Sequence, residues 1–264
     1  MISLISLLTA IGFAAIYPLT FWIHQRDPLK QDFHKFHIGL PNFVGGVAVV
    51  MMIVTRRYWE ILPLAVAWKI ALLSVSSYSW RKGTVKPALV SLPCAMGVLV
   101  YAAALDLYVI APNPFIQGFP TLLFASLLGC VIFSLSLYAM NLGHWYLNVH
   151  GLPIKHLMRA ARVFWAFLLV RLFWDALVLG QGRVFFDGEN IPLWKFSLTL
   201  DGIFIWLAVF FGTVFPAVSL YFVEGTLQVK STQSATGILY VILTSVLIGD
   251  LAYKYYMIRY GIYL

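Results

Sequence analysis

The sequence has few charged residues, and this scarcity excludes most classes of soluble protein. Asp, Glu, Lys and Arg together make up 11% of the 264 residues, whereas an average soluble domain has about 25%. Hydrophobic residues account for 61% of the chain, and the mean hydropathy is +0.87. A soluble fold of this size could not bury so much apolar surface. We therefore exclude a cytoplasmic enzyme, a secreted disulfide scaffold, a disordered segment and a nucleic-acid-binding protein.

Cysteines and catalytic or metal-binding motifs are also scarce. The two cysteines, Cys94 and Cys130, lie inside apolar runs and form no CxxC motif. The sequence contains no Walker A loop, no HExxH and no GxSxG. His24, His34 and His37 lie close together in the sequence, but their spacing matches no standard set of metal ligands. The sequence therefore predicts no metal site.

The chain does contain eight apolar runs, most of them near the length of about 20 residues that a helix needs to cross a bilayer. They cover residues 2–23, 38–55, 59–80, 87–111, 121–147, 160–180, 193–222 and 231–258. The second run contains Gly39, Pro41, Gly45 and Gly46, which could break it into a re-entrant segment. We expect an all-α integral membrane protein, with one polytopic domain over residues 1–264. Short loops should join its helices into a bundle of about eight transmembrane spans.

The distribution of Lys and Arg between the loops predicts the orientation of the chain. One side carries Arg26, Lys30, Lys35, Arg81, Lys82, Lys86, Lys155, Arg159, Arg162 and Lys230. The other side carries the smaller set Arg56, Arg57, Arg183, Lys195, Lys254 and Arg259. Because cytoplasmic loops are enriched in Lys and Arg, we expect both termini on the outer side. The pattern predicts a multi-pass protein of a bacterial cytoplasmic (inner) membrane, surrounded by lipid and without a nucleic-acid partner.

Charged residues also occur within or at the ends of the apolar runs. They are Lys69, Asp106, Arg171, Asp175, Asp201, Asp250 and Lys254. Each charge near the bilayer centre costs at least about 2.5–3.5 kcal/mol, so each one needs an explanation. Arg171 and Asp175 are four residues apart, as are Asp250 and Lys254, and this spacing places each pair on one helix face. These charges either fix helix packing or form a functional site, in which four outer-half aspartates line a cavity that exchanges protons or holds a cation.

A second group of polar residues lies in the sequence NLGHWYLNVH, at the end of the fifth run. Asn141, His144 and Asn148 are spaced i, i+3 and i+7, which places them on one helical stripe. Histidines on membrane helices ligate b-type haem and donate hydrogen bonds to quinone carbonyls. The candidate residues for binding a quinone or one b-type haem are therefore His144 with Asn141 and Asn148, together with His34 or His37. The alternative is that these histidines lie at the interface with their polar tips in water and bind no ligand.

Besides an intramembrane lipid enzyme, three functions remain compatible with the sequence. The first is an integral membrane subunit of a respiratory-type electron-transfer complex that interacts with a quinone or a single b-type haem. The second is a non-catalytic scaffold or assembly subunit of a membrane complex. The third is a proton- or ion-coupled transporter that uses the intramembrane Lys, Arg and Asp residues. Whether the chain is an enzyme is left open, but the first two functions require other subunits as partners.

Overall fold

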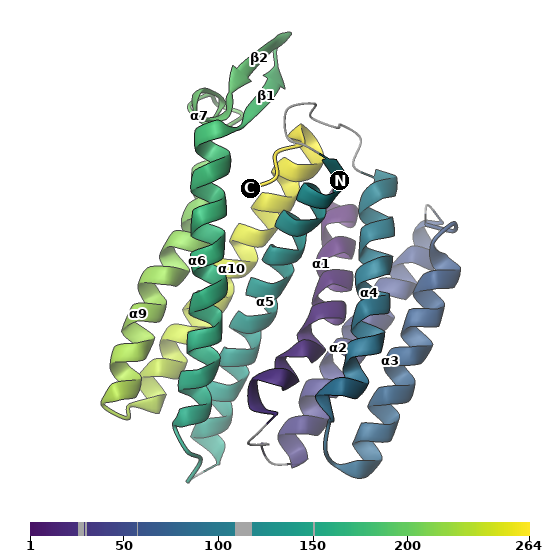
Figure 1. Ribbon diagram of the computed structural model, residues 1–264, viewed down its shortest axis with the longest axis vertical. Coiled ribbons are helices and arrows are strands. Elements are labelled where there is room, and N and C mark those ends of the chain that lie inside the picture. Colours follow the sequence, from purple (N-terminus) through teal and green to yellow (C-terminus); the bar gives the residue numbers. More distant parts are fainter. Residues whose placement is uncertain (26–28, 30, 57, 109–117, 150) are drawn as a thin grey trace. The chain divides into compact units, whose positions relative to one another are not determined.

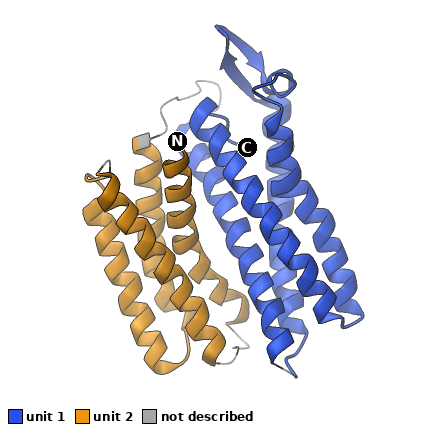
Figure 2. Cartoon of the chain, turned by 180° about the vertical axis from the view of Figure 1, so that it is seen from behind, with its two compact units in different colours: residues 1, 108–264 blue, residues 2–107 orange. Residues whose placement is uncertain are grey.

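The structure is a computed structural model of the 264-residue chain, and it describes all residues except 26–28, 30, 57, 109–117 and 150. The chain divides into two compact units, which Figure 2 shows in different colours. Unit 2 comprises residues 2–107, and unit 1 comprises residue 1 together with residues 108–264. Each unit contains a cluster of buried apolar side chains of its own.

Unit 2 is built from long apolar helices. Its elements are α1 (Ile2–Ile16), the short 3-10 helix η1 (Tyr17–His24), α2 (Gln31–Thr55), α3 (Leu62–Lys82) and α4 (Pro87–Tyr108). Pro18 lies at the start of η1, where the α-helical hydrogen bonding of α1 gives way to a 3-10 helix. The helix that continues from α1 into η1 forms a single span over Ile2–His24.

Trp68 of α3 explains why glycines occur on the neighbouring helices. Its side chain is fully buried. A Cβ atom on Gly97 of α4 would lie 2.7 Å from the indole Nε1 of Trp68, and one on Gly45 of α2 would lie 3.4 Å from its ring. Helix α2 is continuous through Pro41, so the re-entrant break that the sequence suggested for the second span does not occur. Its glycines instead allow the helices of unit 2 to approach one another closely.

Unit 1 contains longer helices and one short hairpin. Its elements are α5 (Gly118–Asn148), α6 (Lys155–Gln181), β1 (Arg183–Phe186), β2 (Glu189–Pro192), α7 (Leu193–Phe196), α8 (Phe204–Val209), the π-helix η2 (Phe210–Val214), α9 (Phe215–Gln228) and α10 (Thr232–Tyr260). Helices α8, η2 and α9 follow one another without a break and form one span over Phe204–Gln228. The predicted span over 193–222 was therefore wrong in its start, because α7 and a turn precede the spanning helix.

The hairpin of β1 and β2 was not predicted, although its turn has a recognisable sequence. The strands are antiparallel, with Phe186 opposite Glu189. Asp187 and Gly188 form the turn with φ values of 52° and 83°. Positive φ at both positions is the geometry of a two-residue type I′ hairpin turn, for which Asp-Gly is a favoured sequence. Figure 1 shows that the hairpin projects beyond the end of α6.

The eight predicted runs correspond to eight helical spans. Among the described residues, the helices long and apolar enough to cross a membrane are Ile2–His24, Gln31–Thr55, Leu62–Lys82, Pro87–Leu107, Gly118–Asn148, Lys155–Gln181, Phe204–Gln228 and Thr232–Tyr260. Continuous apolar helices of this length satisfy their backbone hydrogen bonds internally, as a bilayer requires. The protein is therefore a multi-pass helical membrane protein.

Candidate functional site

Unit 1 contains a buried group of ionisable side chains, which we call the Arg171 cluster. It consists of Arg171 and Asp175 of α6, Thr213 of η2, and Asp250, Tyr253 and Lys254 of α10. The four charged members are each no more than 4% exposed. Because isolated buried charges are very costly, the partners of each member decide what the cluster can do.

The guanidinium of Arg171 has one ion-pair partner, two hydrogen-bond acceptors and one aromatic ring beside it. Its Nε lies 3.1 Å from Oδ1 of Asp175, so the ion pair expected from the four-residue spacing is present. Nη1 donates to the carbonyl of Ala125 at 3.0 Å, and Nη2 donates to the carbonyl of Leu264 at 2.6 Å. The guanidinium also lies 3.8 Å from the ring centroid of Tyr253, which is a cation–π distance.

The carbonyl of Leu264 reaches Arg171 because residues 261–264 fold back after α10. Gly261 ends α10 in the left-handed conformation, with φ 64°. Ile262, Tyr263 and Leu264 are then all buried. The indole Nε1 of Trp174 donates to the carbonyl of Tyr263 at 2.8 Å, which fixes this segment beside α6.

Asp175 accepts hydrogen bonds from two other helical segments. Its Oδ2 accepts from the hydroxyl of Tyr253 at 2.6 Å and from the hydroxyl of Thr213 at 2.8 Å. Its Oδ1 lies in the ion pair with Nε of Arg171, at a geometry that is not a hydrogen bond. Asp175 is therefore held by α6, η2 and α10 together.

Close backbone contact places Thr213 within reach of Asp175. A Cβ atom on Gly249 of α10 would lie 2.1 Å from Cα of Gly212, so only glycine permits this approach. Gly212 and Thr213 lie within η2, where the wider π-helical turn interrupts the regular α-helix. Such π-helical turns are frequent at functional sites in membrane and soluble proteins alike.

Asp250 and Lys254 form the second ion pair of the cluster. Oδ2 of Asp250 accepts a short hydrogen bond from Nζ of Lys254. Oδ1 of Asp250 points at α5, where a Cβ atom on Gly129 would lie 2.6 Å from it and 3.9 Å from Nη1 of Arg171. Because Gly129 has no side chain, Asp250 and Arg171 can both approach α5 at this position.

Two small cavities lie beside this second pair. Each has a volume of about 10 Å³, and both are lined by Gly129, Arg171, Asp250 and Tyr253. A water molecule needs about 10–15 Å³ of such volume, so each cavity approaches the size of one water. Lys254 lines the first cavity only, and Asp175 lines neither.

The remaining intramembrane charges do not join the Arg171 cluster. Asp201 lies in the turn before α8 and is exposed, and its carboxylate accepts from the hydroxyl of Tyr260 at 3.2 Å. Asp106 is exposed near the end of α4 in unit 2. Lys69 of α3, also in unit 2, donates to the backbone and side-chain oxygens of Asn42 at 2.6 and 2.5 Å. Of the four aspartates expected to share a site, two therefore lie close to Arg171.

The histidines proposed as quinone or haem ligands fall in both units. In unit 1, Nδ1 of His144 is 2.9 Å from the hydroxyl of Tyr240 on α10, and the His144 side chain is otherwise exposed. His144 therefore has a polar neighbour on another helix. Asn148 is also exposed and donates to the carbonyl of His144 at 3.3 Å, and Asn141 is half-buried two turns earlier.

In unit 2, His34 and His37 lie among aromatic rings. Nδ1 of His37 is 2.5 Å from the hydroxyl of Tyr17, and the buried imidazole stacks on Phe33 at 3.8 Å. Nδ1 of His34 accepts from the backbone N–H of Val85 at 3.3 Å. Packing of this kind is the usual role of a buried histidine, and no group of His, Cys, Asp and Glu in the described part of the chain could hold a metal ion.

Sequence reasoning missed Thr213 and Tyr253. Tyr253 lies three residues after Asp250 in the same apolar run, and that spacing could have placed it beside the charged pair. Nothing near Thr213 in the sequence marks it, because its role depends on contact between η2 and α10.

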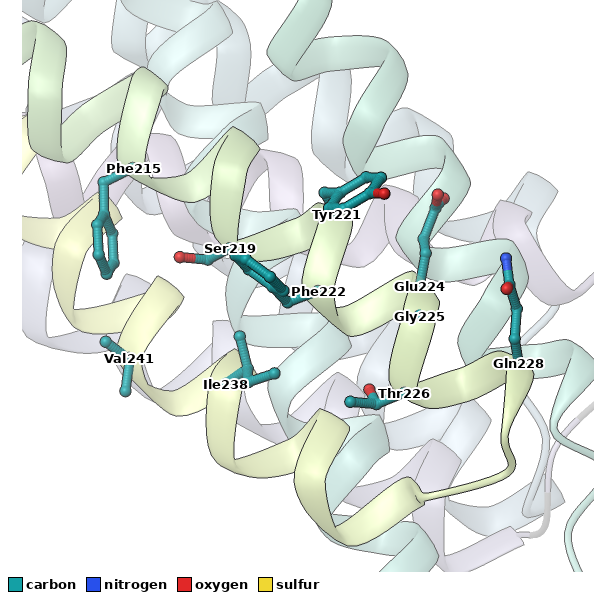
Figure 3. A pocket seen from close by; sticks show the side chains of 10 residues that line it. All are labelled: Phe215, Ser219, Tyr221, Phe222, Glu224, Gly225, Thr226, Gln228, Ile238 and Val241. Carbon is teal, nitrogen blue, oxygen red and sulfur yellow. The ribbon is translucent and has the colours of Figure 1, made fainter.

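An open groove of about 650 Å³ lies away from the cluster, between α9 and α10 (Figure 3). It is lined mainly by apolar side chains, among them the exposed Tyr221 and Phe222, with Glu224 toward the end of α9. No member of the Arg171 cluster lines it. In a bilayer, lipid chains would fill such a surface groove, so we take the cluster as the candidate site.

Comparison with known proteins gives no relative from which a function could be transferred. No family model matches the chain, and neither a curated protein nor a solved structure shows significant similarity to it. The functional argument therefore depends on the geometry of the described residues.

Proposed function

We propose that this protein exchanges protons inside the membrane, and that the Asp250–Lys254 pair of the Arg171 cluster is the group that binds and releases them. The observation that carries this proposal is the pair of water-sized cavities, since both are lined by Asp250. A water molecule in such a space would be a neighbour with which Asp250 can exchange a proton. Ionisable groups held within membrane helices characteristically mark such routes.

The two ion pairs of the cluster have different roles in this proposal. Oδ2 of Asp175 accepts two hydrogen bonds, its Oδ1 is ion-paired with Arg171, and it lines neither of the two cavities, so it serves as the fixed counter-charge of Arg171. Oδ2 of Asp250 is paired with the ammonium group of Lys254, and its Oδ1 points at Gly129 beside the two cavities. The side chains of Arg171, Asp175, Asp250 and Lys254 carry two positive and two negative charges, and uptake of one proton by Asp250 adds one positive charge. The fixed Arg171–Asp175 pair then limits the rearrangement that this change requires.

Two membrane processes need such a site. Quinol oxidation in an electron-transfer complex releases protons that must be carried away, and a proton-coupled transporter must bind and release a proton in each cycle. We propose the first setting, with the chain as an integral subunit of an electron-transfer complex in a bacterial cytoplasmic membrane. Proton-coupled transport is the alternative, and a purely structural cluster is what the experiment below must exclude.

Infrared difference spectroscopy of the full chain in lipid nanodiscs tests the proposal. On lowering the pH within the range in which the protein stays folded, a band of a protonated carboxyl group should appear. The band should be lost in Asp250→Asn and retained in Asp106→Asn and Asp201→Asn, because these two aspartates are exposed and separate from the cluster. A spectrum in which Asp250→Asn changes no pH-dependent carboxyl band would show that the cluster only holds the helices together.

Quinone binding at His144 is a second candidate function, supported by the hydrogen bond between Nδ1 of His144 and Tyr240. That bond orients the imidazole and leaves Nε2 directed elsewhere, and an N–H at Nε2 could donate to a quinone carbonyl. From Gly129 to His144 is 15 residues along α5, or roughly 22 Å at 1.5 Å per residue. The two sites therefore lie toward opposite ends of the same helix.

The quinone content of the purified protein and its reduced-minus-oxidised optical spectrum test this second candidate. His144→Leu should lower the amount of bound quinone, whereas Leu147→Ala, in an exposed apolar neighbour, should leave it nearly unchanged. A b-type haem band lost in His144→Leu would assign a haem instead. Equal quinone content in all three proteins, without a haem band, would leave His144 as an interfacial side chain.

A further inference from the structure

Helix α2 presents an apolar face that the described residues of unit 2 leave uncovered. Phe43, Val47, Val50 and Val54 are all exposed, and they are spaced by four, three and four residues. Apolar residues at this spacing form one seam along a helix and are typical of contacts between two helices. A groove of about 580 Å³ follows the seam, with Gly46 and Met51 also in its lining.

An apolar face alone would be equally well satisfied by lipid, because lipid chains are as apolar as these side chains. The feature that distinguishes this face is Lys69 of α3. A Cβ atom on Gly46 would lie 3.6 Å from Cε and 3.9 Å from Nζ of Lys69, so the ammonium group lies beside the groove. The Lys69 side chain is half-buried.

Lys69 has only neutral partners in the part of the chain that the structure describes. Its Nζ donates to the backbone oxygen and to Oδ1 of Asn42. The amide of Asn42 is in turn held by the carbonyl of Leu72 and by the hydroxyl of Ser76. An ammonium group has three donors, and no carboxylate of the described residues forms an ion pair with this one. The positive charge is thus oriented but not neutralised.

The depth of Lys69 limits what could neutralise it. Asn42 and Gly46, which flank the ammonium group, lie at the middle of α2 (Gln31–Thr55). Phospholipid headgroups lie at the membrane surface, about half a bilayer thickness away from the middle of a spanning helix. A neutralising group at this depth is therefore best supplied by another transmembrane segment.

We propose that this α2 face, defined by Phe43, Gly46, Val47, Val50 and Val54, binds a transmembrane helix of another membrane protein. A carboxylate of that helix pairs with Lys69. A seam of the observed spacing fits a helix, and Gly46 permits close approach. A second copy of this chain docking through the same face would bring two Lys69 ammonium groups together, which like-charge repulsion disfavours. The proposal does not depend on proton exchange at the Arg171 cluster, because Lys69 belongs to the other unit.

Site-specific photocrosslinking in the native membrane tests this proposal. A benzophenone amino acid replaces Val50, at the centre of the seam, in the full-length chain. The matched control carries the same probe at Leu92 of α4, which is exposed to a similar degree. We expect a protein adduct from position 50 only, with the crosslinked peptide of the partner coming from a transmembrane segment that contains Asp or Glu.

The charge of Lys69 is tested in the same assay. Lys69→Met should lower the yield of this adduct at least tenfold, whereas Lys69→Arg should largely preserve it. Exchanging the charges, with Lys69→Asp in this chain and Lys in place of the partner's acid, should restore the adduct. If Lys69→Met does not accumulate in the membrane, the identity of the adduct formed with Lys69 present decides the matter alone.

Several results would overturn the proposal. They are adducts with lipid alone, an adduct with a second copy of this chain, a partner segment without an acidic residue, and a yield that is unchanged in Lys69→Met. Each of these leaves the infrared test of Asp250 unaffected, so the two proposals can fail separately.

Discussion

The two units differ in whether their intramembrane charges are paired with charges of opposite sign. In unit 1, the positive side chains of Arg171 and Lys254 pair with the carboxylates of Asp175 and Asp250. In unit 2, the only partners of Lys69 among the described residues are neutral oxygens of Asn42, beside an exposed groove. Charges that pair with one another need no partner from outside the chain. An ammonium group that contacts only neutral oxygens still requires an anionic partner. This difference separates a site at which chemistry can occur from a surface at which a partner can dock.

Removing a charge from the neutral cluster should have the largest effect on stability. Arg171→Leu leaves Asp175 as an uncompensated buried anion, and we expect a loss of about 3–5 kcal/mol in the free energy of unfolding. The measurement is denaturant unfolding of the purified protein in detergent micelles.

The control for this change is Arg183→Leu. Arg183 lies in β1 and donates from its exposed side chain to the carbonyl of Asn190, so its loss should cost no more than about 0.5 kcal/mol. If both variants unfolded at the same denaturant concentration, the cluster would not be the stabilising feature that its burial indicates.

A smaller loss is expected when one hydrogen bond of the cluster is removed. Tyr253→Phe keeps the ring under Arg171 but deletes the hydroxyl that donates to Asp175. Because this hydrogen bond is to a charged group, the free energy of unfolding should fall by about 1.5–3 kcal/mol. Tyr255→Phe, two residues away and half-buried, is the matched control and should change stability by less. The same loss in both would contradict a specific role for the Tyr253 hydroxyl.

Filling the space beside Asp250 should also cost stability. In Gly129→Ala the new methyl group would lie 2.6 Å from Oδ1 of Asp250, and such overpacking typically costs about 1–3 kcal/mol. It should also abolish the pH-dependent carboxyl band of Asp250. Gly237→Ala in α10 is the control, because nothing lies within 4 Å of the added Cβ atom. That change should leave stability equal or raise it by up to about 1 kcal/mol, since Ala favours the helix.

Lys69 provides the smallest expected effect and the sharpest contrast. In the purified chain, Lys69→Met loses hydrogen bonds to Asn42 but leaves no carboxylate unpaired. Removal of an unneutralised charge offsets that loss, so the change in the free energy of unfolding should stay within about 1 kcal/mol. A destabilisation as large as that of Arg171→Leu would mean that unit 2 neutralises Lys69 in its own fold. The distinction between the two units would then be lost.

The spans and the ion pairs could be predicted from the sequence because both depend on neighbours along the chain. Eight apolar runs predicted eight spanning helices, and the four-residue spacing of Arg171 and Asp175 predicted their contact. The Asp187–Gly188 turn belongs to the same class, since its positive φ angles follow from residue type, although it was overlooked. The start of the seventh span was misplaced because apolar residues in α7 and the following turn resemble a helix by composition alone.

Which charges meet was decided only by the tertiary structure. The sequence presented four aspartates at similar apparent depth, but only Asp175 and Asp250 approach Arg171, and Asp201 is in an exposed turn. Thr213 joins because Gly212 and Gly249 allow two backbones to touch, and Leu264 joins because the chain folds back after Gly261.

The physical reason is the difference between local and long-range constraints. Helix formation in lipid and pairing at four-residue spacing need only a periodic backbone and the chemistry of nearby residues, which the amino-acid sequence determines directly. The rotation of each helix and its contact with segments tens of residues away depend on how all side chains fill the interior at once. The sequence therefore determined a membrane protein with charged helices. Packing decided that Arg171 and Lys254 pair with carboxylates, whereas Lys69 contacts neutral oxygens among the described residues.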